Sequence, residues 1–522
     1  MSNKDCTLRR LTRRSISRRE FLRYAGLAGL TLLSGRAATP LFGGQSNRAR
    51  ADESHQVYLP LIAKVPPIPP LSQEMVQEAY EFYSLGDPVP PTNLRFEFKP
   101  NLSNPDQPAI VFARDPETGE IILATRFNPE TQEQEWHVAK LRDLADAVGM
   151  RIGTNLSSPW FDQATIARHD EIVKDNFNHA IVDHFFMGEI MQEPDIFHPK
   201  ATRFNFEKAR RVIDLAKANG MTVEASPIIY GESDFKESWS LLKKYWELAK
   251  QSGFTDAIKN NVSWDEARRM RTDPEYGNQL LENLVDSLPD PEKREELREV
   301  RRRLREFIAY YVQRVVGEFQ GEVNIWRLAN EFDMNPQSLW DPYFWLVGPD
   351  YPDLIFQAAR EADPNAKLII NPAPGYEPGD PYFFDMTVPV IQRLKQKGII
   401  DGVGDQGHEY ASQPFNWKRR LDRDWGVEVL ITERDVNLEN VPGTQEERFE
   451  LQAEIYAYSL REALSHNVKF FTLWESYGDD EDNWFERMVG EQNADPTIFD
   501  DYQPKSAYFV LKAELEKVVD QQ

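Results

Sequence analysis

The chain has 522 residues, of which 41% are hydrophobic and 28% charged, and this is enough for a sizeable buried core. Its formal net charge of −24 makes nucleic acid and anionic membrane surfaces unfavourable partners. The only cysteine is Cys6, so a chain that has lost its first residues forms no disulfide and has no thiol ligand for a metal.

The first 51 residues are typical of an export leader. A basic segment precedes a short apolar stretch at 24–34, and "SRREFLR" at 17–23 resembles a twin-arginine signal. We expect cleavage after Ala51, within "ARADES", and an exported, extracellular or cell-surface protein without stable membrane insertion. An N-terminal amphipathic helix is the alternative interpretation.

Residues 52–73 are proline-rich and predict a linker. A small, possibly β-rich N-terminal extension is predicted over 74–136. It begins with a helix at 73–83 and contains a hairpin at 109–127, "AIVFARDPETGEIILATRF", where two apolar runs flank a turn.

Short β-branched runs alternate with helical periodicity from residue 137 to the end. Strands are predicted at 150–155, 179–186, 221–230, 323–331, 367–373, 400–408, 427–435 and 468–476. Helical stretches such as 204–220 and 444–466 separate most of them. Eight βα units predict an α/β fold, a (β/α)₈ TIM barrel over 137–522. A doubly wound open sheet is the alternative.

One connection, after the third strand, is much longer than a βα unit needs. Residues 231–300 are rich in charge and predict an inserted helical lid. Insertions at the carboxyl ends of barrel strands border the active site, so this segment is expected to shape substrate access.

Two glutamates follow apolar strands: Glu331 ends the fourth strand and Glu433 lies at the end of the seventh. Residues at these strand ends converge on one mouth of a barrel. Two carboxyl groups there can cleave a glycosidic bond, one protonating the leaving oxygen while the other attacks or activates water. Solvated surface glutamates are the alternative.

The neighbouring motifs resemble those of glycoside hydrolase family 10, the endo-1,4-β-xylanase family. "WRLANE" at 326–331 resembles W-D-V-V-N-E, "ITERDVN" at 431–437 resembles I-T-E-L-D-I, and "DGVGDQGHE" at 401–409 resembles D-G-I-G-x-Q-x-H. "FTLWESYGDDEDNW" at 471–484 is similar to the eighth-strand motif. The similarity spans roughly residues 137–515.

The resemblance implies a role for each matching residue. Glu331 is the expected acid/base and Glu433 the nucleophile of a retaining double displacement, with carboxyl groups about 5 to 5.5 Å apart. Asn330 is expected to bind the sugar 2-hydroxyl. The other expected substrate-binding residues are Gln406, His408, which would orient Glu433, Trp474, Trp484 and Tyr230. No metal or organic cofactor is implied.

The chain departs from the family where the sugar on the non-reducing side binds. The E-N-x-M-K-W motif of the second strand is replaced by "DHFFMGEIMQEP" at 183–194, which lacks the lysine. Ser226, Tyr230 and Gly231 stand where the third strand has histidine, tryptophan and histidine. We therefore expect an enzyme acting on β-1,4-linked plant polysaccharide such as xylan, with two alternatives: the same mechanism on another β-glycan, and a non-catalytic glycan-binding barrel.

Overall fold

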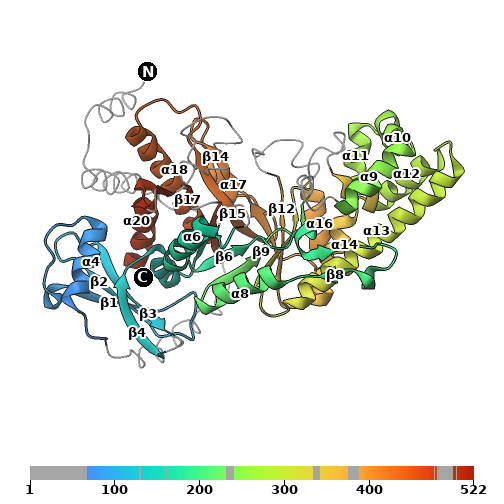
Figure 1. Cartoon of the computed structure of the whole chain (residues 1–522). Coiled ribbons are helices and arrows are strands. Elements are labelled where there is room, and N and C mark those ends of the chain that lie inside the picture. Colours follow the sequence, from blue (N-terminus) through green and yellow to red (C-terminus); the bar gives the residue numbers. More distant parts are fainter. Residues whose placement is uncertain are drawn as a thin grey trace, which may run out of the picture.

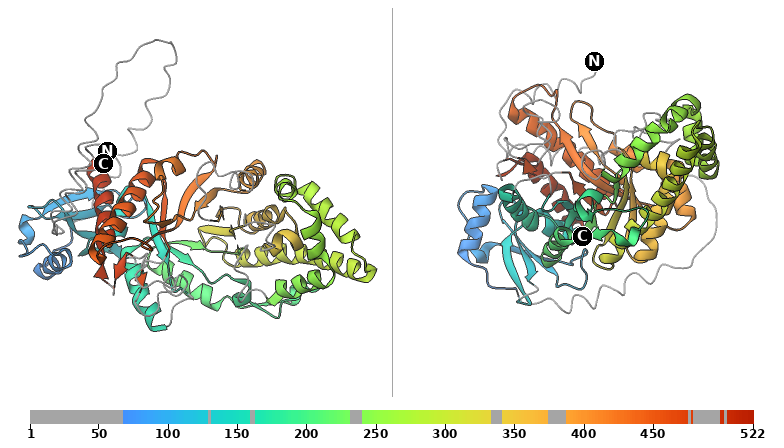
Figure 2. Two further views of the ribbon diagram at one scale, coloured as in Figure 1. Left: turned by 90° about the horizontal axis from the view of Figure 1, so that it is seen from above. Right: turned by 45° about the vertical axis from the view of Figure 1, so that its right-hand side comes forward.

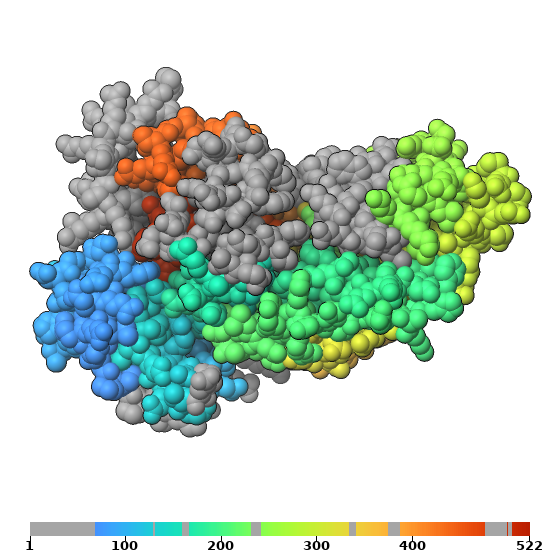
Figure 3. Space-filling view, in the orientation of Figure 1, coloured from blue at the N-terminus to red at the C-terminus, as the bar shows by residue number. Residues whose placement is uncertain are grey.

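A computed structural model of the protein describes residues 68–128, 131–158, 163–230, 240–332, 341–373, 387–474, 477–478, 498–500 and 503–522. The molecule is elongated: an N-terminal unit lies at one end, an inserted group of helices at the other, and a barrel between them (Figures 1 and 2). Figure 3 shows the same outline, blue at the N-terminal unit and yellow-green at the insertion. The predicted leader, 1–51, lies outside the described residues.

The N-terminal unit consists of a helix on a four-stranded antiparallel sheet. Its elements are α4 (Gln73–Tyr83), β1 (Arg95–Lys99), β2 (Ile110–Arg114), β3 (Ile121–Asn128) and β4 (Glu133–Val138), with strand order β1-β2-β3-β4. The hairpin at 109–127 corresponds to β2 and β3, whereas β1 and β4 were not predicted. The sheet ends at Val138, two residues beyond the predicted boundary at 136.

Helix α4 is amphipathic, and its apolar face covers the sheet. The Ser72 hydroxyl accepts a hydrogen bond from the Met75 N–H (3.2 Å) and caps the helix. Val76, Ala79, Tyr80 and Tyr83 pack with Val111, Leu123 and Trp136 in a core separate from the barrel core. Trp136 Nε1 also donates to the Pro69 carbonyl (2.8 Å), so the last residues of the predicted 52–73 linker belong to this unit.

Eight parallel strands form a closed barrel. They are β5 (Arg151–Asn155), β6 (His179–Val182), β9 (Thr222–Ala225), β11 (Ile325–Asn330), β12 (Lys367–Asn371), β13 (Gly402–Asp405), β15 (Glu428–Asn437) and β16 (Phe470–Leu473). They pair in chain order, and β16 pairs with β5 to close the ring. The predicted (β/α)₈ fold is confirmed, and the open sheet is excluded because no barrel strand is an edge.

Helices surround the barrel between its strands. They are α5 (Leu141–Val148), α6 (Gln163–Asn176), α7 (Met187–Ile190), α8 (Glu207–Ala218), α14 (Tyr351–Ala362), α16 (Val388–Gln396), α17 (Trp417–Leu421), α18 (Gln445–Ser465) and α20 (Ser506–Gln521), with a π-helical turn at Tyr343–Val347. Short strands complete the structure: β7 (Met191–Gln192), β8 (Arg203–Phe204), β10 (Ile229–Tyr230), β14 (His408–Tyr410), β17 (Tyr477–Gly478), β18 (Phe499–Asp500) and β19 (Gln503–Pro504).

The N-terminal sheet is attached to the barrel through α20. Lys99 Nζ donates to the Val519 carbonyl (2.7 Å), and the Ile121 N–H donates to Glu516 Oε1 (3.1 Å). Helix α20 in turn packs against α18 and α5. These contacts join the extension to the last helix of the barrel.

The described part of the long connection after β9, from residue 240 on, is helical. It contains α9 (Ser240–Gln251), α10 (Phe254–Asn261), α11 (Trp264–Thr272) and α12 (Pro274–Asp286), followed by α13 (Pro291–Glu318). Helix α13 begins inside the predicted 231–300 insertion and continues as a barrel helix. Arg271 Nη2 donates to Asp341 Oδ2 (3.2 Å), and Asn278 Nδ2 donates to Asp350 Oδ1 (3.0 Å). The insertion therefore packs on the segment that follows β11.

The barrel interior is apolar near the amino ends of the strands and polar nearer their carboxyl ends. Ile325, Ile369, Leu430 and Phe470 form a small buried cluster near the start of their strands. Two residues further along β11, β12 and β15 stand Arg327, Asn371 and Thr432, all buried. Since alternate strand residues face the same side, these polar side chains lie on the same inner face, toward the carboxyl-end mouth.

Candidate active site

Glu433 faces the barrel interior next to Thr432, because the strand is irregular there. The register of β15 against β16 shifts between Ile431 and Arg434. Such a bulge redirects side chains. Thr432 Oγ1 donates to Asn371 Oδ1 (2.7 Å), and Asn371 Nδ2 donates to Glu433 Oε1 (2.8 Å), so both neighbours on β15 contact the same inner residue.

Both carboxylate oxygens of Glu433 accept hydrogen bonds. Oε1 is bonded by Asn371 and also by the Arg327 guanidinium, and Oε2 lies 3.0 Å from His408 Nε2. Only 4% of Glu433 is exposed. Charged and amide donors on both oxygens fix the orientation of this carboxyl group.

His408 bridges two carboxylates. Its Nδ1 lies 2.6 Å from Asp435 Oδ2, while Nε2 contacts Glu433. The pairing of β14 with β15 brings this about, because it sets His408 opposite Asp435. Burial opposes charging of the imidazole, but Asp435 and Glu433 outweigh it and raise the pKa of His408 well above its usual value. The ring therefore carries a proton near neutral pH and donates to Glu433.

Asn330 and Glu331 lie at the end of β11, where the register against β12 also shifts, between Arg327 and Ala329. Asn330 Oδ1 accepts from Asn371 Nδ2 (2.5 Å). The Glu331 N–H donates to the Asn371 carbonyl (2.8 Å), and Gln406 Nε2 donates to Glu331 Oε1 (3.3 Å). Glu331 has a φ of 50°, an uncommon backbone conformation that costs about 1–3 kcal/mol and clusters at functional sites.

Asn371 brings the two glutamates to one mouth, since its main chain holds Glu331 and its side chain holds Glu433. Their surroundings differ. Glu433 is paired with a guanidinium and an imidazole, whereas Glu331 accepts a hydrogen bond from the neutral amide of Gln406. Two carboxyl groups at one barrel mouth in different environments are the arrangement in which one group can act as a nucleophile and the other as an acid.

The other predicted substrate-binding residues are placed as follows. Trp474 lies edge-on to His408, with ring centroids 5.9 Å apart. Tyr230 pairs with Asn330 between β10 and β11. Trp484 lies outside the described residues.

The segment after β6, where the chain departs from the family motif, contains buried charge. Burial raises the pKa of Asp183 to about 7, with Glu433 and Glu224 adding to it against Arg327 and His184. Asp183 is 3% exposed, and its Oδ2 has no hydrogen-bond partner among the described residues. His184 is held between Glu189 Oε1 (2.9 Å) and the Ser157 carbonyl (2.9 Å), so Glu189 positions a residue of this segment.

Three residues of the site were not predicted: Asn371, Asp435 and Arg327. Asn371 is a polar residue that ends an apolar run, as Glu331 does, and the same rule could have found it. Arg327 stands inside the apolar run of β11, where a charged residue is unusual. Its partner Glu224 is equally buried in β9.

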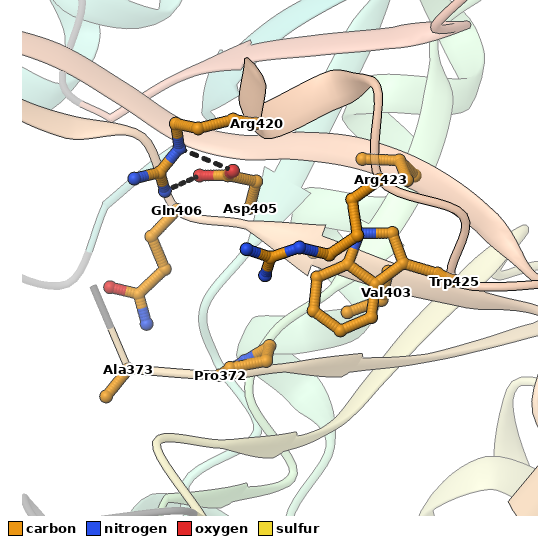
Figure 4. A pocket seen from close by; sticks show the side chains of 10 residues that line it. Pro372, Ala373, Val403, Asp405, Gln406, Arg420, Arg423 and Trp425 are labelled. Atoms are coloured by element: carbon orange, nitrogen blue, oxygen red, sulfur yellow. Dashed lines mark hydrogen bonds and ion pairs between the residues drawn. The ribbon is translucent and has the colours of Figure 1, made fainter. Parts of the chain in front are cut away.

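A pocket opens on the other side of β13 (Figure 4). Its lining includes Val403, Gly404 and Asp405 of this strand and the flat ring of Trp425. Arg420 binds Asp405 through two hydrogen bonds of 2.7 and 3.0 Å. Gln406 borders both this pocket and Glu331, so the pocket adjoins the carboxylate site across the strand.

Comparison with known proteins agrees with this geometry. Residues 284–514 match the model of glycosyl hydrolase family 10. Endo-1,4-beta-xylanase A of Thermotoga neapolitana is 31% identical over 329 residues, which is 60% of this chain and 25% of that protein. Endo-1,4-beta-xylanase B of the same organism is 24% identical over 72% of this chain and 92% of its own length. The chain thus spans about a quarter of the first relative and most of the second.

A solved structure shows the same fold. Xylanase 10B from Thermotoga petrophila RKU-1, in complex with xylobiose, superposes with a TM-score of 0.52 at 22% identity, over 73% of this chain and 98% of that one. Fold and site together define a parallel (β/α)₈ barrel with two glutamates at its mouth, the arrangement that glycoside hydrolases use. Over residues 284–514 the chain is thus similar to glycosyl hydrolase family 10, at low sequence identity to the xylanases compared.

Proposed function

We propose that the protein is an exported, retaining endo-β-glycosidase that hydrolyses β-1,4-linked plant polysaccharide such as xylan. The observation that carries the proposal is the environment of Glu433, an interior carboxylate held on both oxygens by Asn371, Arg327 and His408. Glu331 stands at the same mouth, on the strand end that the family motif assigns to the acid/base.

The first step forms a glycosyl-enzyme. A carboxylate oxygen of Glu433 attacks the anomeric carbon, the glycosidic C–O bond breaks, and the departing oxygen takes the proton of Glu331. Asn330, whose side chain accepts a hydrogen bond from Asn371, binds the sugar 2-hydroxyl in this proposal. His408 and Asn371 hold the attacking carboxylate in one orientation, which lowers the entropic cost of the step.

The second step releases the sugar. Water attacks the anomeric carbon and gives its proton to Glu331, while the bond to Glu433 breaks and its electron pair returns to the carboxylate. The configuration at the anomeric carbon is thereby retained. Glu331 makes both proton transfers, and Glu433 forms and releases the bond to the sugar.

The altered segment after β6 favours a second candidate, the same mechanism on a β-glycan other than plain xylan. His184, tied to Glu189, stands in the segment where the family has its lysine, so the donors offered to a sugar there differ. Sites built on hydrogen bonds discriminate steeply when those bonds change.

Reducing-sugar release from a panel of β-glycans tests the proposal. We expect release from xylan or from a decorated or mixed-linkage relative of it, and loss of release in Glu433→Ala and Glu331→Ala. A wild-type protein that binds a panel member and releases nothing from any would instead be a glycan-binding barrel.

Export is the remaining part of the proposal. The basic, apolar and small-residue order of 1–51 supports it, and N-terminal sequencing of the protein from culture medium should begin at Asp52. Among the described residues, no helix has the length and apolar character needed to cross a bilayer.

A further inference from the structure

A buried ion-pair network connects the barrel core to Glu433. Arg327 donates to Glu224 Oε1 through Nε (2.9 Å) and Nη2 (2.5 Å), and its Nη1 donates to Glu433 Oε1. Glu224 Oε2 lies 3.1 Å from His179 Nε2. Arg327, Glu224 and His179 are each no more than 1% exposed. Arg327 also replaces the aspartate of the W-D-V-V-N-E motif, so this network is a feature of this chain.

The charge of Arg327 is firmly held. Burial opposes it, but Glu224 and Glu433 outweigh burial and raise the pKa of Arg327 above its usual value. Glu224 remains ionised because Arg327 and His179 outweigh its own burial and lower its pKa. Arg327 is therefore a cation near neutral pH, paired with Glu224.

Glu433, in contrast, changes charge during the proposed reaction. It is an anion in the free enzyme and a neutral ester in the glycosyl-enzyme. The attraction between Arg327 and Glu433 is therefore present before the first step and after the second, and absent between them. Because this pair is buried, its loss is not compensated by water.

Resting on the function proposed above, we propose that Arg327 is a positioning residue that acts through Glu433 to speed hydrolysis of the glycosyl-enzyme. In that step, the bond between the anomeric carbon and Glu433 breaks and its electron pair returns to the carboxylate, while water adds to the carbon and its proton goes to Glu331. The guanidinium already lies beside Oε1, so it stabilises the negative charge that develops on the Glu433 carboxylate as the bond breaks.

The kinetic consequence is specific. Without Arg327, no ion pair is lost when the ester forms, and none is regained when the ester is hydrolysed. Hydrolysis therefore slows, and the glycosyl-enzyme accumulates. With a substrate whose leaving group needs no proton, kcat and KM should then fall together while kcat/KM changes little. A residue that only supports the barrel would lower kcat/KM as well, because misplacement of Glu433 slows its attack.

The experiment compares the wild type with Arg327→Met, Arg327→Lys and the double variant Arg327→Met/Glu224→Gln, using 2,4-dinitrophenyl β-xylobioside in stopped flow. The double variant removes both buried charges, so no unpaired Glu224 carboxylate remains to unfold the barrel. Arg393→Met/Asp353→Asn is the matched control, since it removes an ion pair of 2.8 Å between α16 and α14. The control should lose stability and keep wild-type kcat.

We expect the double variant to release about one dinitrophenolate per active site in a burst, followed by a kcat reduced on the order of 100-fold. KM should fall in parallel, and Arg327→Lys, which keeps the charge, should have an intermediate kcat. The inference would be overturned if the double variant lost kcat/KM and showed no burst, although its thermal unfolding showed it to be as fully folded as the Arg393→Met/Asp353→Asn control. A wild type that releases no dinitrophenolate would instead refute the proposed action on xylan.

Discussion

His408 Nε2 lies 3.0 Å from Glu433 Oε2, while the other ring nitrogen contacts Asp435. The imidazole thus stands between two carboxylates on one strand and is held charged by both. This relationship ties the protonation of a histidine to the orientation of the proposed nucleophile, and it can be tested through activity and through stability.

His408→Gln should lower kcat about 10- to 100-fold, because a hydrogen bond to a charged group contributes about 1.5–3 kcal/mol and the glutamine amide is neutral. Steady-state kinetics on the active panel glycan measures this. Unchanged kcat would show that Asn371 and Arg327 suffice to hold Glu433.

The same variant should change how stability depends on pH. The folded-state pKa of His408 is raised, so its contribution is fully present below the unfolded value of about 6.5 and is lost as pH rises through the folded value. Thermal unfolding should therefore show the largest gap between wild type and His408→Gln near pH 6 and a smaller gap at alkaline pH. A gap that widens with pH would contradict the ion-pair assignment.

Asp183→Asn should stabilise the protein at pH 8. Because burial raises the folded-state pKa of Asp183 to about 7, the folded protein binds more protons than the unfolded chain between about pH 4 and 7. Wild-type stability therefore falls as pH rises through this window, and the neutral amide avoids that loss. Denaturant unfolding at pH 5 and pH 8 should show a gain for the variant that is larger at pH 8. An equal gain at both would mean that Asp183 titrates normally.

Glu331→Ala should have an effect that depends on the leaving group. On a polysaccharide, kcat/KM should fall by about 10²–10⁴, because the departing alcohol needs a proton. On 2,4-dinitrophenyl β-xylobioside, kcat/KM should fall far less, since dinitrophenolate leaves unprotonated. Equal losses on the two substrates would remove Glu331 from the role of acid.

Gly404→Ala tests the packing around Asn371. A Cβ at Gly404 would lie 2.0 Å from Asn371 Oδ1, so the amide that holds both Asn330 and Glu433 must move. We expect loss of most activity. Gly317→Ala is the control: its nearest neighbour, Ala362 Cβ, is 4.0 Å away, and alanine within α13 should add up to about 1 kcal/mol of stability. Retained activity in Gly404→Ala would show that Asn371 is dispensable.

The barrel could be predicted from sequence because its strands are apolar runs of regular length separated by amphipathic helices. Strands β1 and β4 of the N-terminal sheet were missed because "RFEFK" and "EQEWHV" carry charged residues and are largely half-exposed or exposed. Their identity as strands depends on pairing with β2 and β3 rather than on their own composition.

The site was predicted only in part, because its geometry depends on long-range contacts. Arg327 and Glu224 are 103 positions apart and become partners only when β11 pairs with β9. The strand irregularities near Leu328 and Thr432, which allow Asn330 and Glu433 to contact Asn371, leave no composition signal. If side chains alternated strictly along β15, Thr432 and Glu433 would point to opposite faces of the sheet and could not both contact Asn371.

The central claim is that Glu433 forms a covalent bond to the sugar. Incubation with 2,4-dinitrophenyl 2-deoxy-2-fluoro-β-xylobioside, which slows the second step, followed by intact-mass measurement and peptide mapping, tests it most directly. The account predicts one fluoroglycosyl group per chain, attached to Glu433 and absent in Glu433→Ala. Attachment to another residue, or turnover with inverted configuration and no attachment, would contradict it.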